Sequence, residues 1–161
     1  MSACASHGFE AGRDLLWWPP DPDAATGQRP PWPTIVFLHG KGERGGPAEL
    51  AAVARWGLPR LRLAGRSPIA GPFPFLVAAP QCGAEHTWCD GAIAGRLAGL
   101  VDDLVATGRA DPRRLYIAGF SMGGIGAFAL ALGHSQRFAA LVSVCGRCPE
   151  EDRLAELCEL P

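Results

Sequence analysis

Short, continuous apolar runs recur along the chain and alternate with longer segments whose apolar residues are spaced three or four apart. Short apolar runs rich in β-branched and aromatic residues are typical of strands covered on both faces, and the wider spacing predicts amphipathic helices. The predicted strands are 14–18, 34–38, 75–79, 115–120 and 138–144. The predicted helices are 48–56, 91–107, 122–132 and 150–160. Because strands alternate with helices, we expect an α/β fold, a mostly parallel sheet with right-handed crossovers and helices on both faces.

Glycine, proline and aspartate residues set the expected boundaries of these elements. Asp21 to Pro33 reads as a loop, and Gly57 with Pro59 is expected to end the helix 48–56. Asp90 is a candidate cap for the helix 91–107, and Asp111-Pro112 predicts a turn before the strand 115–120. The side chains expected to face the core from the helix 91–107 are Ile93, Leu97, Leu100, Val101, Leu104 and Val105, and those from the last helix are Leu154, Leu157 and Cys158.

A Gly-x-Ser-x-Gly sequence joins the strand 115–120 to the following helix without a gap. A serine in such a turn adopts strained backbone geometry, and the glycines on either side, Gly119 and Gly123, let strand and helix close around it. We therefore expect Ser121 to be a nucleophile at the carboxyl edge of the sheet, with a positive φ angle. The helix that follows points its amides at the same place, so the N–H of Met122 is a candidate oxyanion donor.

A second glycine-rich segment, His39 to Gly46, follows the buried strand 34–38. Such a loop exposes backbone amides, and the amide of Lys41 is the candidate for the second oxyanion donor. Two other glycine-rich motifs do not fit. A dinucleotide fingerprint counted from Gly119 needs glycine where Ser121 stands, and no Gly-Lys-Ser/Thr follows at the spacing of a Walker phosphate loop.

Composition narrows the class of protein further. The chain has 161 residues, 48% of them hydrophobic, which fits one domain spanning 1–161 with residues 1–13 as a loose end. A formal net charge of −1 argues against a nucleic-acid or anionic-membrane partner. No apolar run approaches a membrane span and the N-terminus lacks the pattern of a secretion signal, so we expect a cytoplasmic protein.

The six cysteines favour reduced thiols over a disulfide framework in this setting. Cys145 and Cys148 have metal or redox spacing, and Cys82 with Cys89 could supply the other half of a four-thiolate site. The strands ending near Cys82 and Cys145 are expected three positions apart, about 14 Å at the usual interstrand spacing. A zinc ion holds all its sulfurs at about 2.3 Å, so we predict no metal site.

Four segments in this order resemble α/β-hydrolases of the esterase and predicted-peptidase branch, close to the phospholipase/carboxylesterase and dienelactone-hydrolase groups. They are Phe-Leu-His-Gly-Lys-Gly-Glu-Arg-Gly (37–45), Ala-Ala-Pro-Gln-Cys (78–82) with the following Trp88, Gly-Phe-Ser-Met-Gly-Gly (119–124) and Arg-Phe-Ala-Ala-Leu-Val-Ser-Val-Cys-Gly (137–146). The resemblance implies acyl-group hydrolysis through a serine ester on Ser121, without a metal or organic cofactor. It also makes His39, Gly40, Gln81 and Trp88 candidates for the substrate pocket.

The resemblance also implies an acid and a histidine after the serine, and here the sequence departs from the family. The single histidine after Ser121 is His134, beyond the helix that carries the serine. His39 occupies the oxyanion-loop position, where relatives use the side chain structurally, and His86 follows the strand 75–79. The expectation is therefore a hydrolase domain truncated near Pro161, which lacks the last strands and helices of the fold.

Two functional classes remain open at this point. The first is a serine hydrolase of carboxylic esters or thioesters, resembling carboxylesterases and acyl-protein thioesterases, with a small-molecule ester or acyl substrate. The second is a catalytically incomplete product of the same fold that acts by binding or dimerisation. A sheet ending at Val144 would leave an apolar edge, so a homodimer through that edge is a further expectation.

Overall fold

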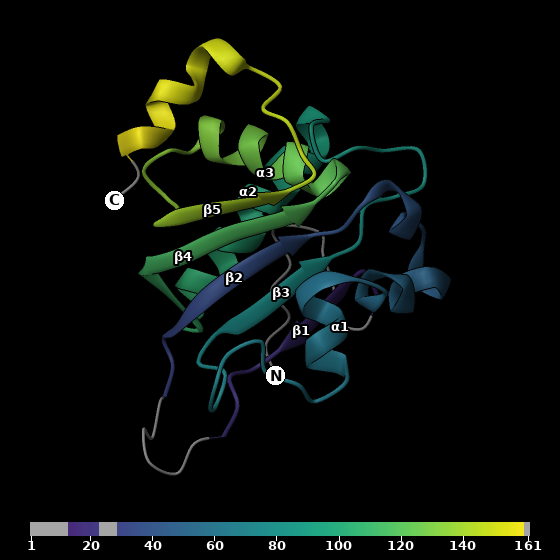
Figure 1. Cartoon of the computed structure of the whole chain (residues 1–161), viewed down its shortest axis with the longest axis vertical. Coiled ribbons are helices and arrows are strands. Elements are labelled where there is room, and N and C mark those ends of the chain that lie inside the picture. The colour runs from purple at the N-terminus through teal and green to yellow at the C-terminus, as the bar shows by residue number, and fades with distance from the viewer. Residues whose placement is uncertain (1–12, 23–28, 160–161) are drawn as a thin grey trace.

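The structure, a computed structural model, describes residues 13–22 and 29–159. Within them lies a sheet of strand order β1-β3-β2-β4-β5, in which β1 is antiparallel to β3 and the other neighbours are parallel (Figure 1). The strands are β1 (Leu15–Trp18), β2 (Trp32–Leu38), β3 (Leu76–Pro80), β4 (Ala110–Phe120) and β5 (Ala140–Val144). The α-helices are α1 (Gly57–Leu63), α2 (Gly91–Ala106) and α3 (Met122–Gly133), and the 3₁₀ segments are η1 (Lys41–Glu43), η2 (Pro47–Ala54) and η3 (Glu151–Glu159). The mostly parallel α/β sheet is confirmed.

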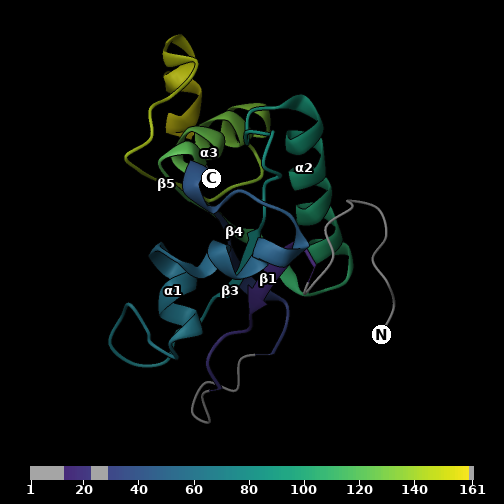
Figure 2. The same cartoon turned by 90° about the vertical axis from the view of Figure 1, so that its right-hand side faces the viewer.

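Helices cover both faces of this sheet, α2 and α3 on one side and α1 on the other (Figure 2). Each face has its own apolar cluster, because neighbouring residues of a strand point to opposite sides. Val36 and Leu38 of β2 pack on the α2 and α3 side, whereas Phe37 between them packs on the side of η2. The expected stripe of α2 is confirmed, with Ile93, Leu97, Leu100, Val101 and Leu104 buried and Val105 partly buried.

The strand register brings the two glycine-rich segments together. β2 and β4 are parallel neighbours, and Leu38 pairs with Gly119. Parallel strands end at the same edge, so Lys41 and Ser121 follow these strands at the carboxyl edge of the sheet, as expected. β4 is longer than expected and begins at Ala110, so Asp111-Pro112 lies within the strand and the expected turn there is wrong. The pairing of β4 with β2 shifts register between Trp32 and Thr34, which absorbs the interruption.

The segment after the glycine-rich loop 39–46, which carries Lys41 and is called the oxyanion loop below, also departs from the sequence prediction. The expected helix 48–56 is a 3₁₀ helix, η2, that ends at Ala54. Gly57 and Pro59 do not stop a helix but open α1. Gly57 takes a positive φ of 65°, and proline is tolerated in a first turn because the first amides of a helix lack partners within it.

Two expectations for helix ends and faces need correction. Asp90 is at the N-cap position of α2, but its carboxylate accepts hydrogen bonds from Thr87 and pairs with His86 instead of capping the helix. The last helix is the 3₁₀ segment η3, where Leu154 and Cys158 are exposed and Leu157 alone of the three packs against the core. The expected loose end, 1–13, falls almost wholly outside the described residues. No helix in the described part of the chain is long and apolar enough to cross a membrane.

Candidate active site

Ser121 stands at the junction of β4 and α3 with φ 53° and ψ −115°. The expected positive φ is confirmed. A β-carbon on Gly119 would lie 2.1 Å from the carbonyl oxygen of Gly123, and one on Gly123 would lie 1.9 Å from that of Leu38. The Ser121 amide donates to the carbonyl of Val144 at 2.7 Å, which ties the turn to β5. Strand, turn and helix therefore close so tightly around Ser121 that both glycines are required.

The candidate oxyanion donors lie on two elements that start at this edge. Met122 is the first residue of α3, so its amide belongs to the positive end of the helix dipole. Lys41 is the first residue of η1, with Gly40 before it in extended conformation. Because Leu38 pairs with Gly119, these two amides and the Ser121 hydroxyl share the end of one strand pair. Such an arrangement can stabilise negative charge on an oxygen held between the amides.

The side chain of His39 is buried within the loop that carries Lys41. It is 1% exposed; its Nδ1 donates to the carbonyl of Gly40 at 2.7 Å, and its Nε2 accepts from the amide of Cys82 at 3.0 Å. This network assigns the proton to Nδ1 and leaves neither nitrogen for a reacting hydroxyl. Burial lowers the pKa of His39 from 6.5 to about 4, so the ring is neutral at pH 7. His39 therefore fixes the loop and cannot accept the Ser121 proton.

Gln81 and Cys82 brace the same loop from the end of β3. The Gln81 side chain is buried and donates to the carbonyls of Glu43 at 3.2 Å and Glu49 at 3.1 Å. The carbonyl of Cys82 accepts the amide of Gly45 at 3.0 Å. Together with the bond from Cys82 to His39, these contacts hold both ends of the loop that carries Lys41.

Trp88 is 1% exposed, and its Nε1 donates to the carbonyl of His39 at 2.8 Å. A β-carbon on Gly126 would lie 2.2 Å from that of Trp88, so the indole packs directly under α3. Trp88 therefore connects the oxyanion loop to the helix that carries the nucleophile.

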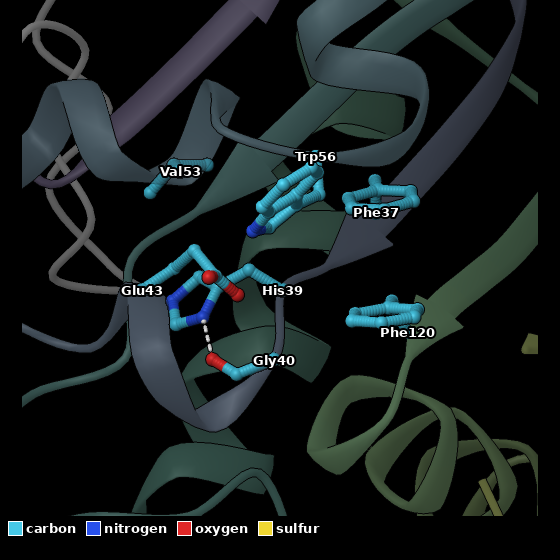
Figure 3. Close-up of a pocket in the computed structure, with 7 residues that line it drawn as sticks. All are labelled: Phe37, His39, Gly40, Glu43, Val53, Trp56 and Phe120. Carbon is cyan, nitrogen blue, oxygen red and sulfur yellow. Dashed lines mark hydrogen bonds between the residues drawn. The ribbon is translucent and has the colours of Figure 1, made fainter. Parts of the chain in front are cut away.

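A narrow pocket opens beside the oxyanion loop on the η2 side of the sheet (Figure 3). It is a crevice too tight to hold an enclosed water molecule, and its empty space of about 160 Å³ includes open solvent. The residues that line it are Phe37, His39, Gly40, Glu43, Val53, Trp56 and Phe120. His39 and Gly40 are among these lining residues, whereas Gln81 and Trp88 are not. Sequence reasoning did not single out Glu43, which lines this pocket and is 5% exposed.

None of the described histidines hydrogen-bonds to Ser121. His86 pairs through Nδ1 with the carboxylate of Asp90 at 3.1 Å, on an exposed loop. His134 follows the last residue of α3, and twelve helical residues separate it from Ser121 by about 18 Å. Among the described residues, the candidate nucleophile Ser121 therefore has no histidine partner.

The described cysteines are free thiols: Cys82, Cys89, Cys145, Cys148 and Cys158. No group of three or more His, Cys, Asp or Glu side chains there is arranged to hold a metal ion. β3 and β5 are three positions apart, as expected for the strands before Cys82 and Cys145. Burial raises the pKa of the Cys82 thiol to about 11, which keeps it protonated at neutral pH.

Comparison with protein families gives a match over half of the chain. A family model described as "Putative esterase" matches residues 68–150, which include Gln81 and Cys82, the turn around Ser121, and β5. Among curated proteins, "Putative esterase NocK" of Nocardia uniformis subsp. tsuyamanensis is 44% identical over 50 residues. These residues make up 31% of this chain and 14% of that protein.

Solved structures of esterases and serine hydrolases share the fold. A thermostable esterase superposes with a TM-score of 0.63 at 25% identity, covering 92% of this chain and 45% of its own. The fluorophosphonate-binding serine hydrolase FphF of Staphylococcus aureus gives 0.61 at 17% identity, covering 87% and 53%. A ferulic acid esterase gives 0.58 at 19%, covering 92% and 60%. The chain spans about half the length of these three proteins.

Proposed function

The chain belongs to the esterase family of α/β-hydrolases, and from this premise we propose that it hydrolyses carboxylic esters through an acyl-enzyme on Ser121. The observation that carries the proposal is the strained serine, φ 53°, held by Gly119 and Gly123 at the edge where η1 and α3 begin. In the proposed reaction the hydroxyl oxygen of Ser121 attacks the ester carbonyl and the alcohol leaves. Water then releases the acid. The amides of Met122 and Lys41 stabilise the oxyanion of both tetrahedral intermediates.

Each attack also requires a base that takes the proton of the nucleophile and returns it to the leaving group. His39 is excluded because backbone groups hold both ring nitrogens, and His134 is excluded by its distance along α3. His86 is exposed and pairs with Asp90 instead of Ser121, so we infer that the base comes from outside the described residues. Thioesters are a second substrate class that the same chemistry accommodates.

The absence of a described base favours a second candidate function, in which this chain binds acyl compounds without turning them over. The two candidates differ in steady-state hydrolysis. If no base reaches Ser121, the 161-residue chain should hydrolyse p-nitrophenyl acetate little faster than its Ser121→Ala variant. An oxyanion site and binding alone leave only about 10³- to 10⁴-fold catalysis over water. Strong turnover that depends on Ser121 would instead support the enzyme.

The nucleophile itself is tested by mass spectrometry of the chain after incubation with p-nitrophenyl acetate. We expect acetylation at Ser121 in advance of any other serine, even where turnover is low, because α3 and η1 stabilise the intermediate that leads to it. Ser67 is an internal control, since it is half-buried on a loop and its hydroxyl donates to the carbonyl of Ile69. Equal acetylation of Ser67 and Ser121 would contradict the proposal.

A further inference from the structure

The segment that runs from η2 through α1 to the end of β3 carries positive charge and no negative charge. Residues 50–84 contain four arginines and no aspartate or glutamate. The formal net charge of −1 is a sum over the whole chain, so it conceals this segment. One of the four, Arg62, is buried and pairs with an aspartate. The other three are exposed and form no ion pair within residues 13–22 and 29–159: Arg55, Arg60 and Arg66.

Two of these arginines share a surface with exposed apolar side chains. Arg60 donates through Nη1 to the carbonyl of Arg55 at 3.4 Å, and its guanidinium carbon lies 5.7 Å from the centroid of the Trp56 ring. Leu63 follows Arg60 by three positions in α1, so the two side chains lie on the same face of the helix. Trp56 is 50% exposed and Leu63 is 66% exposed. We call these four residues the α1 surface.

The loop after α1 has an apolar tip. Residues 68–72, Pro-Ile-Ala-Gly-Pro, are all exposed and include no polar side chain. Ile69 is 48% exposed. Figure 2 shows α1 and this loop at the periphery of the molecule, on the opposite side of the sheet from α2 and α3. Exposed apolar side chains that gather next to polar ones mark a site of interaction with a protein or a membrane.

Charge complementarity indicates the chemistry of the partner. Three arginines without carboxylate partners favour a negatively charged surface. A second copy of the chain does not fit, because two α1 surfaces face to face would oppose arginine to arginine. The exposed apolar side chains stand on a helix and on a loop tip instead of lining a groove. Shallow insertion of such side chains, with arginine heads at the level of the phosphates, is how peripheral proteins bind anionic lipid.

We propose that the α1 surface and the loop tip 68–72 dock this protein on an anionic lipid bilayer. The guanidinium groups of the α1 surface and of Arg66 contact the lipid phosphates. The side chains of Trp56, Leu63 and Ile69 enter the boundary between headgroups and acyl chains. This interaction goes beyond ester hydrolysis and needs no reaction at Ser121, so it stands or falls independently of the proposed function.

Co-sedimentation of the 161-residue chain with vesicles at pH 7 and low salt tests the charge. Vesicles of equal parts phosphatidylglycerol and phosphatidylcholine are compared with vesicles of phosphatidylcholine alone. Each basic residue near an anionic leaflet strengthens binding about fivefold, so we expect binding at least tenfold tighter to the anionic vesicles and weaker as salt is added. The double variant Arg55→Gln/Arg60→Gln should lose at least tenfold in affinity. Arg113→Gln/Arg147→Gln removes the same charge from two other exposed arginines and should lose less than about threefold.

The apolar contribution is tested at the loop tip. Ile69→Ser keeps the charge of the chain and should weaken binding to the anionic vesicles at least threefold, because serine gains little from leaving water. Leu154→Ser is the control, since Leu154 is a 40% exposed apolar residue of η3 and should leave binding unchanged. All the substituted side chains are exposed, and circular dichroism verifies that each variant is folded.

Two results overturn the proposal directly: the chain does not bind anionic vesicles, or the two double arginine variants weaken binding equally. A third result also rejects it. If Ile69→Ser binds as tightly as the parent chain while Arg55→Gln/Arg60→Gln does not, the attraction is electrostatic alone and no side chain enters the lipid. The α1 surface would then be a site for an acidic protein instead of a bilayer.

Discussion

Single residues define the candidate site through the space they leave or fill. The sequence was sufficient to predict the conformation of Ser121, because a Gly-x-Ser-x-Gly pattern between a strand and a helix leaves few alternatives. It was not sufficient for Glu43, which is 5% exposed and lines a pocket together with Phe120, a residue distant in sequence. The role of Gln81 was likewise not predictable from the sequence. Its type and position suggested a pocket residue, whereas its two hydrogen bonds to the carbonyls of Glu43 and Glu49 make it a brace of the loop.

The glycines of the nucleophile turn provide the prediction at this scale. Gly119→Val or Gly123→Val should prevent folding, because the new β-carbon would lie within about 2 Å of backbone atoms that cannot move independently. Gly95→Ala is the control. Gly95 is exposed in α2 with no atom near the added methyl group, so alanine there should raise the free energy of unfolding by about 0.5–1 kcal/mol. Urea unfolding followed by circular dichroism measures the stability of the valine variants and of Gly95→Ala. A cooperatively folded Gly123→Val protein would contradict the geometry of the turn.

At the scale of elements, local signals predicted the strands better than the helices on the η2 side. Buried strands are continuous apolar runs, so their patterns are strong. Gly57 and Pro59 were interpreted as a stop signal, yet they open α1, which is held by contacts distant in sequence. Arg62 of α1 donates to the Asp21 carboxylate at 2.5 Å, and the amide of Phe73 donates to the same carboxylate at 2.8 Å. No local window of sequence contains all three residues.

Asp21 should therefore stabilise the docking of α1, and its contribution should depend on pH. The Arg62 guanidinium, with help from the Phe73 amide, lowers the pKa of Asp21 below its usual 3.8. A lowered folded pKa means that the stabilisation is present above about pH 4 and is lost as the pH falls through the folded value. Asp21→Asn should lower the free energy of unfolding at pH 7 by about 1–3 kcal/mol, because Arg62 is buried and loses its charged partner.

Urea denaturation of the parent chain and Asp21→Asn at pH 7 and pH 3 tests this dependence. The difference between the two proteins should shrink at the lower pH. Asp111→Asn is a comparison at an exposed ion pair with Arg114, where we expect a smaller effect at pH 7. An Asp21→Asn effect equal at both pH values would show that the carboxylate charge contributes nothing.

At the scale of the whole molecule, the two faces of the sheet are covered unequally. In Figure 1, α1 lies over β3 and β1, while no helix of the described residues crosses β4 and β5 on that side. Val142 and Val144 consequently remain 56% and 49% exposed. β5 also pairs with β4 alone within the described chain, so one row of its backbone groups has no strand partner there. Apolar side chains next to an unpaired strand edge favour association.

We predict that the chain self-associates through β5, as the apolar edge suggested from sequence. A two-fold antiparallel pairing centred on Val142 would place Val142 opposite its own copy and Ala140 opposite Val144, with no like charges opposed. Val142→Lys would place two ammonium groups opposite each other and should weaken the dimer roughly tenfold or more. Ile69→Lys, which changes an equally exposed apolar residue far from β5 in sequence, should leave it unchanged. Sedimentation equilibrium measures the dissociation constants. A monomeric parent chain, or equal weakening by the two lysines, would exclude β5 as the interface.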